Sequence, residues 1–418
     1  MSSIATFRPG RRPVPVLPHA VARERSIRRR VGLVWGLLFL NVLTYYPGTW
    51  NGTPLLLAVP HRFGQLITQG SLPAALLVAL SVNPRRLIRP NVFLFLLSLM
   101  VAEVFMSTAH PGDTVHLVGT LYRTLRLTAF VATLWLLTPW WGRRDMLLVR
   151  CHLTALSVVL GSVLLGFILA PGRALSGGRL AGMFWPMPPT QVADFAAVAV
   201  GLVIVLWLGG LVRGRTALLV VLLAGLMLLL THSRTELIAM SAGVLVAGLS
   251  LFTSSARVRK FFASGAVLAS GGVLILSGLV TSWLARGQGT NQLTDLTGRT
   301  TVWSAVIHAQ RDLFHSTFGN GLSNDSFNGF PIDSNWLAAY WDLGFLGVAI
   351  CASLLLYILI SAYFQPRSPQ RALAIYLVTY LLVRSVTETG LNNVSVNLLE
   401  LTLAASLLVA PATARRLE

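Results

Sequence analysis

The chain has 418 residues, of which 54% are hydrophobic and only 11% are charged. A chain with so few charged residues cannot surround a hydrophobic core with a polar surface. The composition therefore excludes a soluble globular protein and indicates a polytopic membrane protein. The 33 basic and 14 acidic residues give a formal charge of +19. These charges are scattered between apolar segments, which argues against the basic patch of a nucleic-acid-binding protein.

The N-terminal residues 1–30 are rich in Arg and Pro and lead into an apolar run without a small-residue cleavage site. This pattern favours a retained tail over a signal peptide. We expect the tail to be cytoplasmic and to contact anionic membrane lipids.

Apolar segments then follow one another along the chain, and a membrane-spanning helix needs about 20 mostly apolar residues. The candidates are 31–46, 65–82, 91–108, 114–141, 150–170, 190–212, 216–232, 235–253, 261–284, 336–363, 371–388 and 396–412. We therefore expect an all-α integral membrane protein with about 12 transmembrane helices. They form a single membrane domain at 31–412, followed by a cytoplasmic tail at 413–418.

Alternating the sides of these helices collects most basic residues on one face, which the positive-inside rule makes cytoplasmic. Besides the tail, that face carries Arg85, Arg86, Arg89, Arg143, Arg144, Arg150, Arg213, Arg215, Arg257, Arg259, Lys260, Arg367, Arg371, Arg415 and Arg416. Both termini are then cytoplasmic and the protein belongs in the cytoplasmic (inner) membrane.

Most acidic residues fall on the other side, or in the outer halves of helices. They are Glu103, Asp113, Asp194, Glu236, Asp295, Asp312, Asp325, Asp333, Asp342, Glu388 and Glu400. Because charge within a membrane is costly, such groups normally face a partner or a water-filled cavity. We expect a polar cavity that opens to the extracytoplasmic side.

Two longer connections, 171–189 and 285–335, lie on this outer side and form the expected active-site region. Within the second, residues 300–314 are predicted to form a short helix along the membrane interface. Its apolar side would carry Trp303, Val306, Ile307 and Phe314. Such a helix would cover the cavity as a lid.

Four arginines on the expected outer side lie beside predicted helix ends and next to other polar residues: Arg179, Arg234, Arg299 and Arg384. A guanidinium binds phosphate oxygens in a forked geometry, so converging arginines suit a diphosphate and the charge of a leaving group. The alternative is that each pairs with a local carboxylate, for example Arg234 with Glu236 or Arg384 with Glu388.

Arg123 and Arg126 lie three residues apart in the fourth span and share one helix face. They are candidates to contact an anionic lipid head group in the cavity. The alternative is a structural ion pair with Glu103 or Asp194.

The candidates for a general base are Asp333, Glu388, His308 and His315, since a base must take the proton of an attacking hydroxyl. Asp333 leads because it lies in the polar loop just before a helix. Asp333-Ser334-Asn335 also suits an N-cap for a helix that starts at Trp336.

Metal and nucleotide motifs are missing from the sequence, which contains no HExxH, CxxC, P-loop or GxSxG pattern. We expect neither a metal nor another cofactor. Cys151 and Cys351 lie in or beside apolar segments and are interpreted as packing residues.

The motifs of the outer loops occur in a characteristic order. They are Gly178-Arg179-Leu180-Ala181-Gly182, Ser233-Arg234, Gly298-Arg299 with Trp303, Gly319-Asn320-Gly321, Ser334-Asn335-Trp336 and Gly344-Phe345-Leu346-Gly347. In order, spacing and topology the chain resembles the O-antigen ligase and O-antigen polymerase superfamily. The resemblance covers about 178–350, with a weaker echo at 384–388.

The resemblance implies an inverting, metal-independent glycosyltransferase of surface polysaccharide biosynthesis at the outer face of the membrane. Its donor would be an oligosaccharide on undecaprenyl diphosphate, and its acceptor a glycan or a lipid-linked glycan. Other polysaccharide-assembly proteins could be partners. By resemblance Arg234 and Arg299 hold the diphosphate and Arg179 assists, while Arg384, Glu388 and Asn335 belong to the substrate site.

Two departures from the family pattern bear on function. Ser334 stands where ligases of the family commonly have His, which favours Asp333 as the base and a polymerase-like member over a lipid A core ligase. Residues 185–189 also lack the Pro-Asn of many relatives. A transporter or flippase of a lipid-linked anionic glycan is the alternative from another class, although the sequence has no internal repeat of the kind common in transporters.

Overall fold

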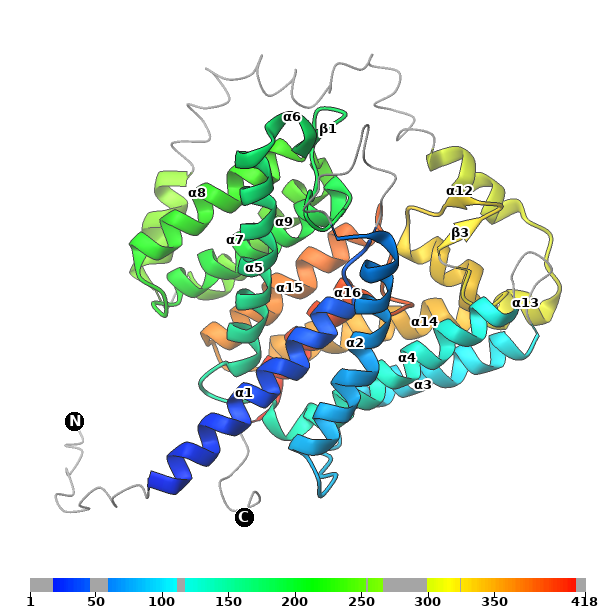
Figure 1. Ribbon diagram of the computed structural model, residues 1–418, viewed down its shortest axis with the longest axis horizontal. Coiled ribbons are helices and arrows are strands. Elements are labelled where there is room, and N and C mark those ends of the chain that lie inside the picture. The colour runs from blue at the N-terminus through cyan, green and yellow to red at the C-terminus, as the bar shows by residue number, and fades with distance from the viewer. Residues whose placement is uncertain are drawn as a thin grey trace, which may run out of the picture.

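The computed structural model describes residues 18–45, 59–110, 117–252, 255–265, 299–323 and 325–410. Helices make up most of this part (Figure 1). The first half contains α1 (Pro18–Asn41), α2 (His61–Val82), α3 (Val92–Ala109), α4 (Leu117–Leu137), the 3-10 turn η2 (Thr138–Trp140), α5 (Leu147–Leu169), α6 (Pro171–Ala174), α7 (Pro189–Leu208), α8 (Gly214–Leu230) and α9 (Arg234–Leu251). The second half contains α12 (Arg299–His308), α13 (Leu313–Phe318), α14 (Asn335–Phe364), α15 (Pro369–Arg384) and α16 (Val396–Leu408).

Among the described residues, six helices are long and apolar enough to cross a membrane, namely α2, α3, α5, α7, α9 and α14. Shorter apolar helices, α8 and α16, accompany them. The span expected at 261–284 lies largely outside the described residues. Among the boundaries that differ from the prediction, α1 already begins at Pro18, within the basic tail, and α15 ends at Arg384, so Glu388 lies outside a helix.

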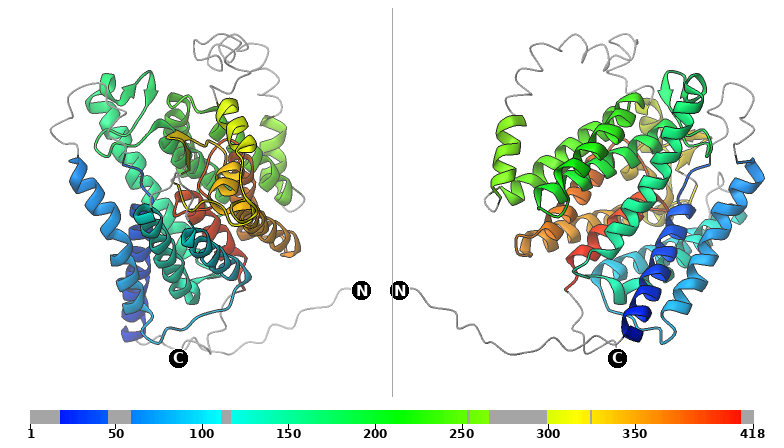
Figure 2. Two further views of the ribbon diagram at one scale, coloured as in Figure 1. Left: turned by 90° about the vertical axis from the view of Figure 1, so that its right-hand side faces the viewer. Right: turned by 60° about the vertical axis from the view of Figure 1, so that its left-hand side comes forward.

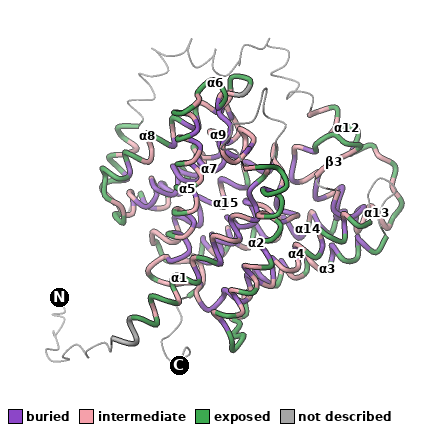
Figure 3. The backbone as a smooth tube through the Cα atoms, viewed as in Figure 1, coloured by how far each residue is buried: buried purple, intermediate pink, exposed green. Residues whose placement is uncertain are grey.

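Exposed positions run along the outside of the helices (Figure 3), and many of them are large hydrophobic residues. Leu66, Leu77, Phe95, Ile168 and Leu222 are each more than half exposed, whereas the carboxylates of Asp194, Glu236 and Glu400 are fully buried. This distribution is the reverse of that in a soluble protein. It is the one expected where lipid is the surrounding solvent.

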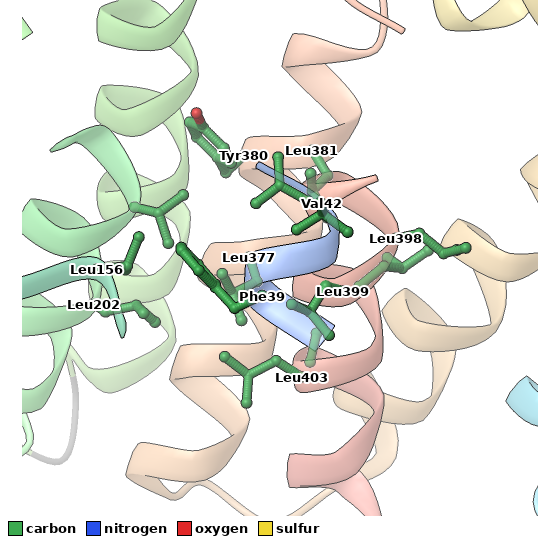
Figure 4. Packing of buried hydrophobic residues seen from close by; sticks show 14 of the residues in the cluster. Phe39, Val42, Leu156, Leu202, Leu377, Tyr380, Leu381, Leu398, Leu399 and Leu403 are labelled. Carbon is green, nitrogen blue, oxygen red and sulfur yellow. The ribbon is translucent and has the colours of Figure 1, made fainter. Parts of the chain in front are cut away.

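The centre of the bundle is packed from helices far apart in the sequence. Phe39 of α1, Leu202 of α7, Leu377 of α15 and Leu399 of α16 meet there (Figure 4). Close approach depends on small residues, because a Cβ on Gly201 would lie 2.0 Å from the ring of Tyr376. Glycine therefore allows α7 and α15 to pack together.

Arg143, Arg144 and Arg371, which the charge pattern assigned to one face, lie together at one end of the bundle. At the arginine-rich end, Arg143 bonds Glu24 of α1 at 2.6 Å and Arg89 donates to the carbonyl of Ala410 at 3.0 Å. The two loops expected outside lie together at the other end, away from the start of α1 (Figures 1 and 2). The structure thus brings both candidate loops to one face of the bundle.

Each outer loop contains a two-stranded hairpin that the sequence analysis did not predict. Strands β1 (Leu175–Ser176) and β2 (Arg179–Leu180) are joined by Gly177-Gly178, and β3 (Ser326–Phe327) and β4 (Phe330–Pro331) by Asn328-Gly329. All four turn residues have positive φ angles. Gly-Gly and Asn-Gly are typical of tight hairpin turns, so the signal was present in the sequence.

The interfacial helix predicted at 300–314 is wrong in its extent, because the chain forms two helices, α12 and α13, with a break at 309–312. Asp312 caps α13 by accepting from the backbone N–H of His315 at 2.8 Å. Arg311 turns inward and donates to the carbonyl of Tyr340 at 2.9 Å. Of the predicted apolar side, Val306 is buried but Ile307 is mostly exposed.

Helix α14 is interrupted at Gly344, which has a φ of +64°. The carbonyls freed by the break are bonded, since Asn320 donates to Trp341 and Gly321 to Asp342. A Cβ on Gly319 would lie 2.2 Å from the oxygen of Asp342. The Gly319-Asn320-Gly321 motif therefore closes the broken end of the helix, which is a structural role.

Candidate functional site

A cavity of about 670 Å³ opens among the helix ends on the side of the two candidate loops. Its walls come from the end of α1, the start of α2, α4 and α7, and the loop 385–395 between α15 and α16. Among its lining residues are Gln65, Gln69, Tyr122, Arg123, Arg126, Gln191, Leu322, Asp325, Glu388, Thr389, Asn393 and Asn397. Charged and amide side chains on several walls fit a polar ligand better than a lipid tail.

One wall of the cavity carries Arg123 and Arg126, and the structure confirms that they share a face of α4. Arg123 donates from Nη1 to the carbonyl of Leu322 at 2.9 Å. Arg126 donates from Nε to the Asn41 side chain at 3.1 Å and from Nη2 to its carbonyl at 2.7 Å. Among the described residues neither forms an ion pair, so the predicted alternative partners Glu103 and Asp194 are not used. Both guanidiniums therefore line the cavity without a carboxylate partner in the described part of the chain.

Near the opposite wall, Arg299 joins two carboxylates from distant parts of the sequence. It is the first residue of α12, and its Nε lies 2.9 Å from Oδ2 of Asp333. Its Nη2 lies 3.4 Å from Oε1 of Glu388, which lines the cavity. Three of the predicted site residues therefore meet, and of these only Glu388 is among the lining residues.

Glu388 is the carboxylate best placed for proton transfer. Burial, followed by the nearby charge of Glu236, raises the pKa of Glu388 from 4.5 to about 7, while Arg384 and Arg299 act in the opposite direction. A pKa near neutrality suits a general base, because much of the carboxylate is then deprotonated at neutral pH and is still basic enough to accept a proton.

Arg179 belongs to the same charge cluster. It lies on β2, and its Nε donates to the carbonyl of Thr231 at 2.8 Å. Burial lowers the pKa of Arg179, the carboxylates of Glu236 and Glu388 raise it, and the charge of Arg299 lowers it. These mutual effects place Arg179 within electrostatic reach of both Arg299 and Glu388.

Arg234 is the first residue of α9, next to this cluster. The hydroxyls of Thr235 and Thr387 are 2.9 Å apart, which ties the start of α9 to the loop that carries Glu388. Arg234 does not pair with Glu236, because that carboxylate bonds Ser233 and Arg384. The Nε of Arg234 is buried and has no hydrogen-bond partner in the described residues.

Arg384 and Asn335 are bound to the protein itself. Arg384 is buried between Asp194 and Glu236, each at 3.5 Å. The alternative that Arg384 pairs with a carboxylate is therefore confirmed, but its partners are distant in the sequence, and the local Glu388 bonds Arg299 instead. Asn335 accepts from the N–H of Leu391 at 2.7 Å and so anchors α14 to the cavity loop. Both residues hold the cavity walls in place.

The expected N-cap at 333–335 is only partly formed. Ser334 is the residue before α14, but its side chain makes no capping hydrogen bond, and the helix begins at Asn335. Asp333 instead bonds Arg299. Ser334 is also buried, so its hydroxyl is poorly placed to meet an acceptor.

Asp325 and the loop 389–393 are site residues that the sequence analysis did not select. Asn393 donates to Oδ2 of Asp325 at 2.8 Å, and both line the cavity. Burial raises the pKa of Asp325. The unusually polar run at 387–397 between two apolar helices was the available signal.

The remaining candidates lie apart from the cavity. The Nδ1 of His308 is 2.8 Å from the carbonyl of Ser304 and that of His315 is 2.6 Å from Asp312. Neither histidine lines the cavity. Within the described ranges no cluster of three or more His, Cys, Asp or Glu could hold a metal ion.

Comparison with known proteins adds no identification. No protein-family model matches the chain, and no curated protein matches it significantly. The resemblance to the O-antigen ligase and polymerase superfamily therefore rests on the motifs of the sequence.

Proposed function

We propose that the protein transfers or polymerises a glycan from an undecaprenyl diphosphate carrier at the outer face of the cytoplasmic membrane. The observation that supports this most is the joining of Arg299, Asp333 and Glu388 at the edge of a polar cavity. A bundle with apolar outer surfaces and a charged cavity suits a substrate that combines a lipid tail with an anionic, sugar-bearing head.

In the proposed reaction, the acceptor hydroxyl attacks the anomeric carbon of the donor glycan. The bond between that carbon and the phosphate oxygen breaks, with inversion, and the hydroxyl proton passes to Glu388. The diphosphate departs with the additional negative charge. Guanidinium groups from Arg299, Arg179 and Arg234 would stabilise that charge.

Glu388 replaces Asp333 as our choice for the base. Glu388 lines the cavity and has a pKa near 7, whereas Asp333 contacts the Arg299 guanidinium from outside the lining. We assign Asp333 the role of orienting Arg299. The buried Ser334 is in keeping with a polymerase-like enzyme over one that uses a histidine at this position.

The test is glycan transfer by purified protein in detergent, with a lipid-diphosphate-linked oligosaccharide as donor and a soluble glycan as acceptor. We expect transfer by the wild type and by Arg215→Ala, an exposed arginine outside the cavity, and a large loss in Glu388→Gln. Transfer by Glu388→Gln at the wild-type rate would refute the proposed base.

The buried ionic cluster of Arg384, Asp194 and Glu236 also suits a transporter of lipid-linked glycan. Proteoliposomes separate the two functions. Movement of the donor across the bilayer, together with no transfer in detergent, would replace the enzyme proposal by the transporter.

A further inference from the structure

A second cavity, of about 230 Å³, lies at the arginine-rich end, opposite the candidate site. Arg143, Arg144, Gln365, Gln370 and Arg371 contribute its polar lining. Since a water molecule takes about 30 Å³, the space admits a group the size of a phosphate with a short polar substituent.

Two helices begin at this cavity. Its lining includes Leu147, Leu148 and Val149, the first residues of α5, and Ser368 and Gln370 at the start of α15. The residue before α5 provides no side-chain cap, whereas Ser368 caps α15 by accepting from the backbone N–H of Arg371 at 3.2 Å. Backbone N–H groups at helix starts lack partners within their helix and favour anions.

The acidic side chains near the cavity do not neutralise all of its arginines. Arg143 is neutralised, because it bonds both Asp145 at 3.0 Å and Glu24 at 2.6 Å. These two acids also engage Arg28. Arg144 is exposed and forms no ion pair among the described residues.

Arg371 reaches the cavity from the first turn of α15. Its Nη1 donates to the carbonyl of Gln365 at 3.1 Å. Its Nε is buried and has no hydrogen-bond partner in the described part of the chain. A buried guanidinium nitrogen without an acceptor is costly, and an anion in the cavity would supply one.

We propose that this cavity binds the phosphate of an anionic phospholipid headgroup through Arg144, Arg371 and the start of α5. Tyr363 and Phe364 precede Gln365 and are 73% and 79% exposed. They provide an apolar surface for the acyl chains beside the headgroup. Basic pockets between membrane helices are typical sites for such lipids.

The experiment is native mass spectrometry of the full chain in detergent, titrated with phosphatidylglycerol or phosphatidylcholine. We expect selective retention of phosphatidylglycerol by the wild type. Binding should weaken about tenfold in Arg144→Ala, as expected for one lost charge-assisted contact, and further in Arg144→Ala/Arg371→Gln. The matched control Arg213→Ala/Arg215→Ala removes two exposed arginines outside the cavity and should bind as the wild type does.

A second arm measures thermal stabilisation by inorganic phosphate alone. Stabilisation that is lost in Arg144→Ala supports the same site with a soluble source of phosphate, whereas stabilisation by phosphatidylglycerol only assigns the lipid. Arg144 is exposed, so its variant is expected to fold. Equal binding by Arg144→Ala and the wild type, or equal retention of both lipids by the wild type, would overturn the proposal.

Discussion

Replacing Arg299 by Ala tests the centre of the candidate site. The change removes the 2.9 Å bond to Asp333 and the 3.4 Å bond to Glu388. The Asp333 side chain is 34% exposed, which limits that pair to about 1 kcal/mol. The Glu388 side chain is only 16% exposed, and a charge-assisted bond there contributes about 1.5–3 kcal/mol. We expect a loss of stability of about 2–4 kcal/mol.

The loss of activity should exceed that of stability if Arg299 meets the leaving diphosphate. Removal of one such donor typically costs about 10²–10³ in rate. Because Arg299 lowers the pKa of Glu388, the variant should also need a higher pH for its residual activity. The assays are glycan transfer in detergent from pH 5 to 9 and thermal unfolding of the same samples.

Two matched variants sharpen this result. Arg299→Lys keeps the charge without the fork and should retain part of the activity. Asp333→Asn removes only the orienting carboxylate and should cost less than Arg299→Ala. Folded Arg299→Ala protein that transfers glycan as fast as Arg215→Ala would refute the reasoning.

Three further predictions concern single side chains. Because the folded-state pKa of Glu388 is raised from 4.5 to about 7, wild-type stability should fall as pH rises through that window, and Glu388→Gln should remove this part of the slope. Gly344→Ala should destabilise by more than about 1–2 kcal/mol, because φ is +64° and the new Cβ would lie 2.3 Å from the carbonyl carbon of Thr317. Arg384→Ala should cost about 3–5 kcal/mol, since two buried carboxylates lose their cation.

Thermal unfolding of the purified protein in detergent measures the stability change in all three cases, and size-exclusion chromatography checks that each variant is monodisperse. Gly36→Ala is the control for Gly344, because its Cβ would meet nothing within 4 Å. An unchanged pH slope in Glu388→Gln would mean that another group titrates there. A Gly344→Ala protein as stable as Gly36→Ala would contradict the strained break in α14, and a stable Arg384→Ala would contradict the buried ion cluster.

Composition was sufficient to predict a helical protein with helices apolar enough to cross a membrane, and the charge pattern was sufficient to group Arg143, Arg144 and Arg371 on one face. These properties follow from local rules: apolar runs of sufficient length, and the cost of moving arginine across a bilayer. The same rules placed Arg123 and Arg126 on one face, because spacing along a helix determines which side chains are neighbours. Gly177-Gly178 and Asn328-Gly329 were also sequence signals for the two hairpin turns, by the same kind of local rule.

The partners of the charged residues depended on tertiary structure. Arg384 is four residues from Glu388, yet it bonds Asp194 and Glu236 from other helices, because α15 ends at Arg384 and the chain then turns. Glu388 instead accepts a hydrogen bond from Arg299, which is 89 residues away in the sequence. Nothing local encodes that pairing, since it follows from how α9, α14 and α15 pack.

The sequence alone therefore determined that the helices have apolar outer surfaces and that the two polar loops lie on one side of the bundle. Both properties depend on the transfer free energy of each residue between water and lipid. Only the tertiary structure decided that Glu388 lies at the cavity while Asp333 bonds Arg299. A carboxylate's basicity and reach depend on burial and on charges brought in from distant segments, and these exist only once the helices are packed.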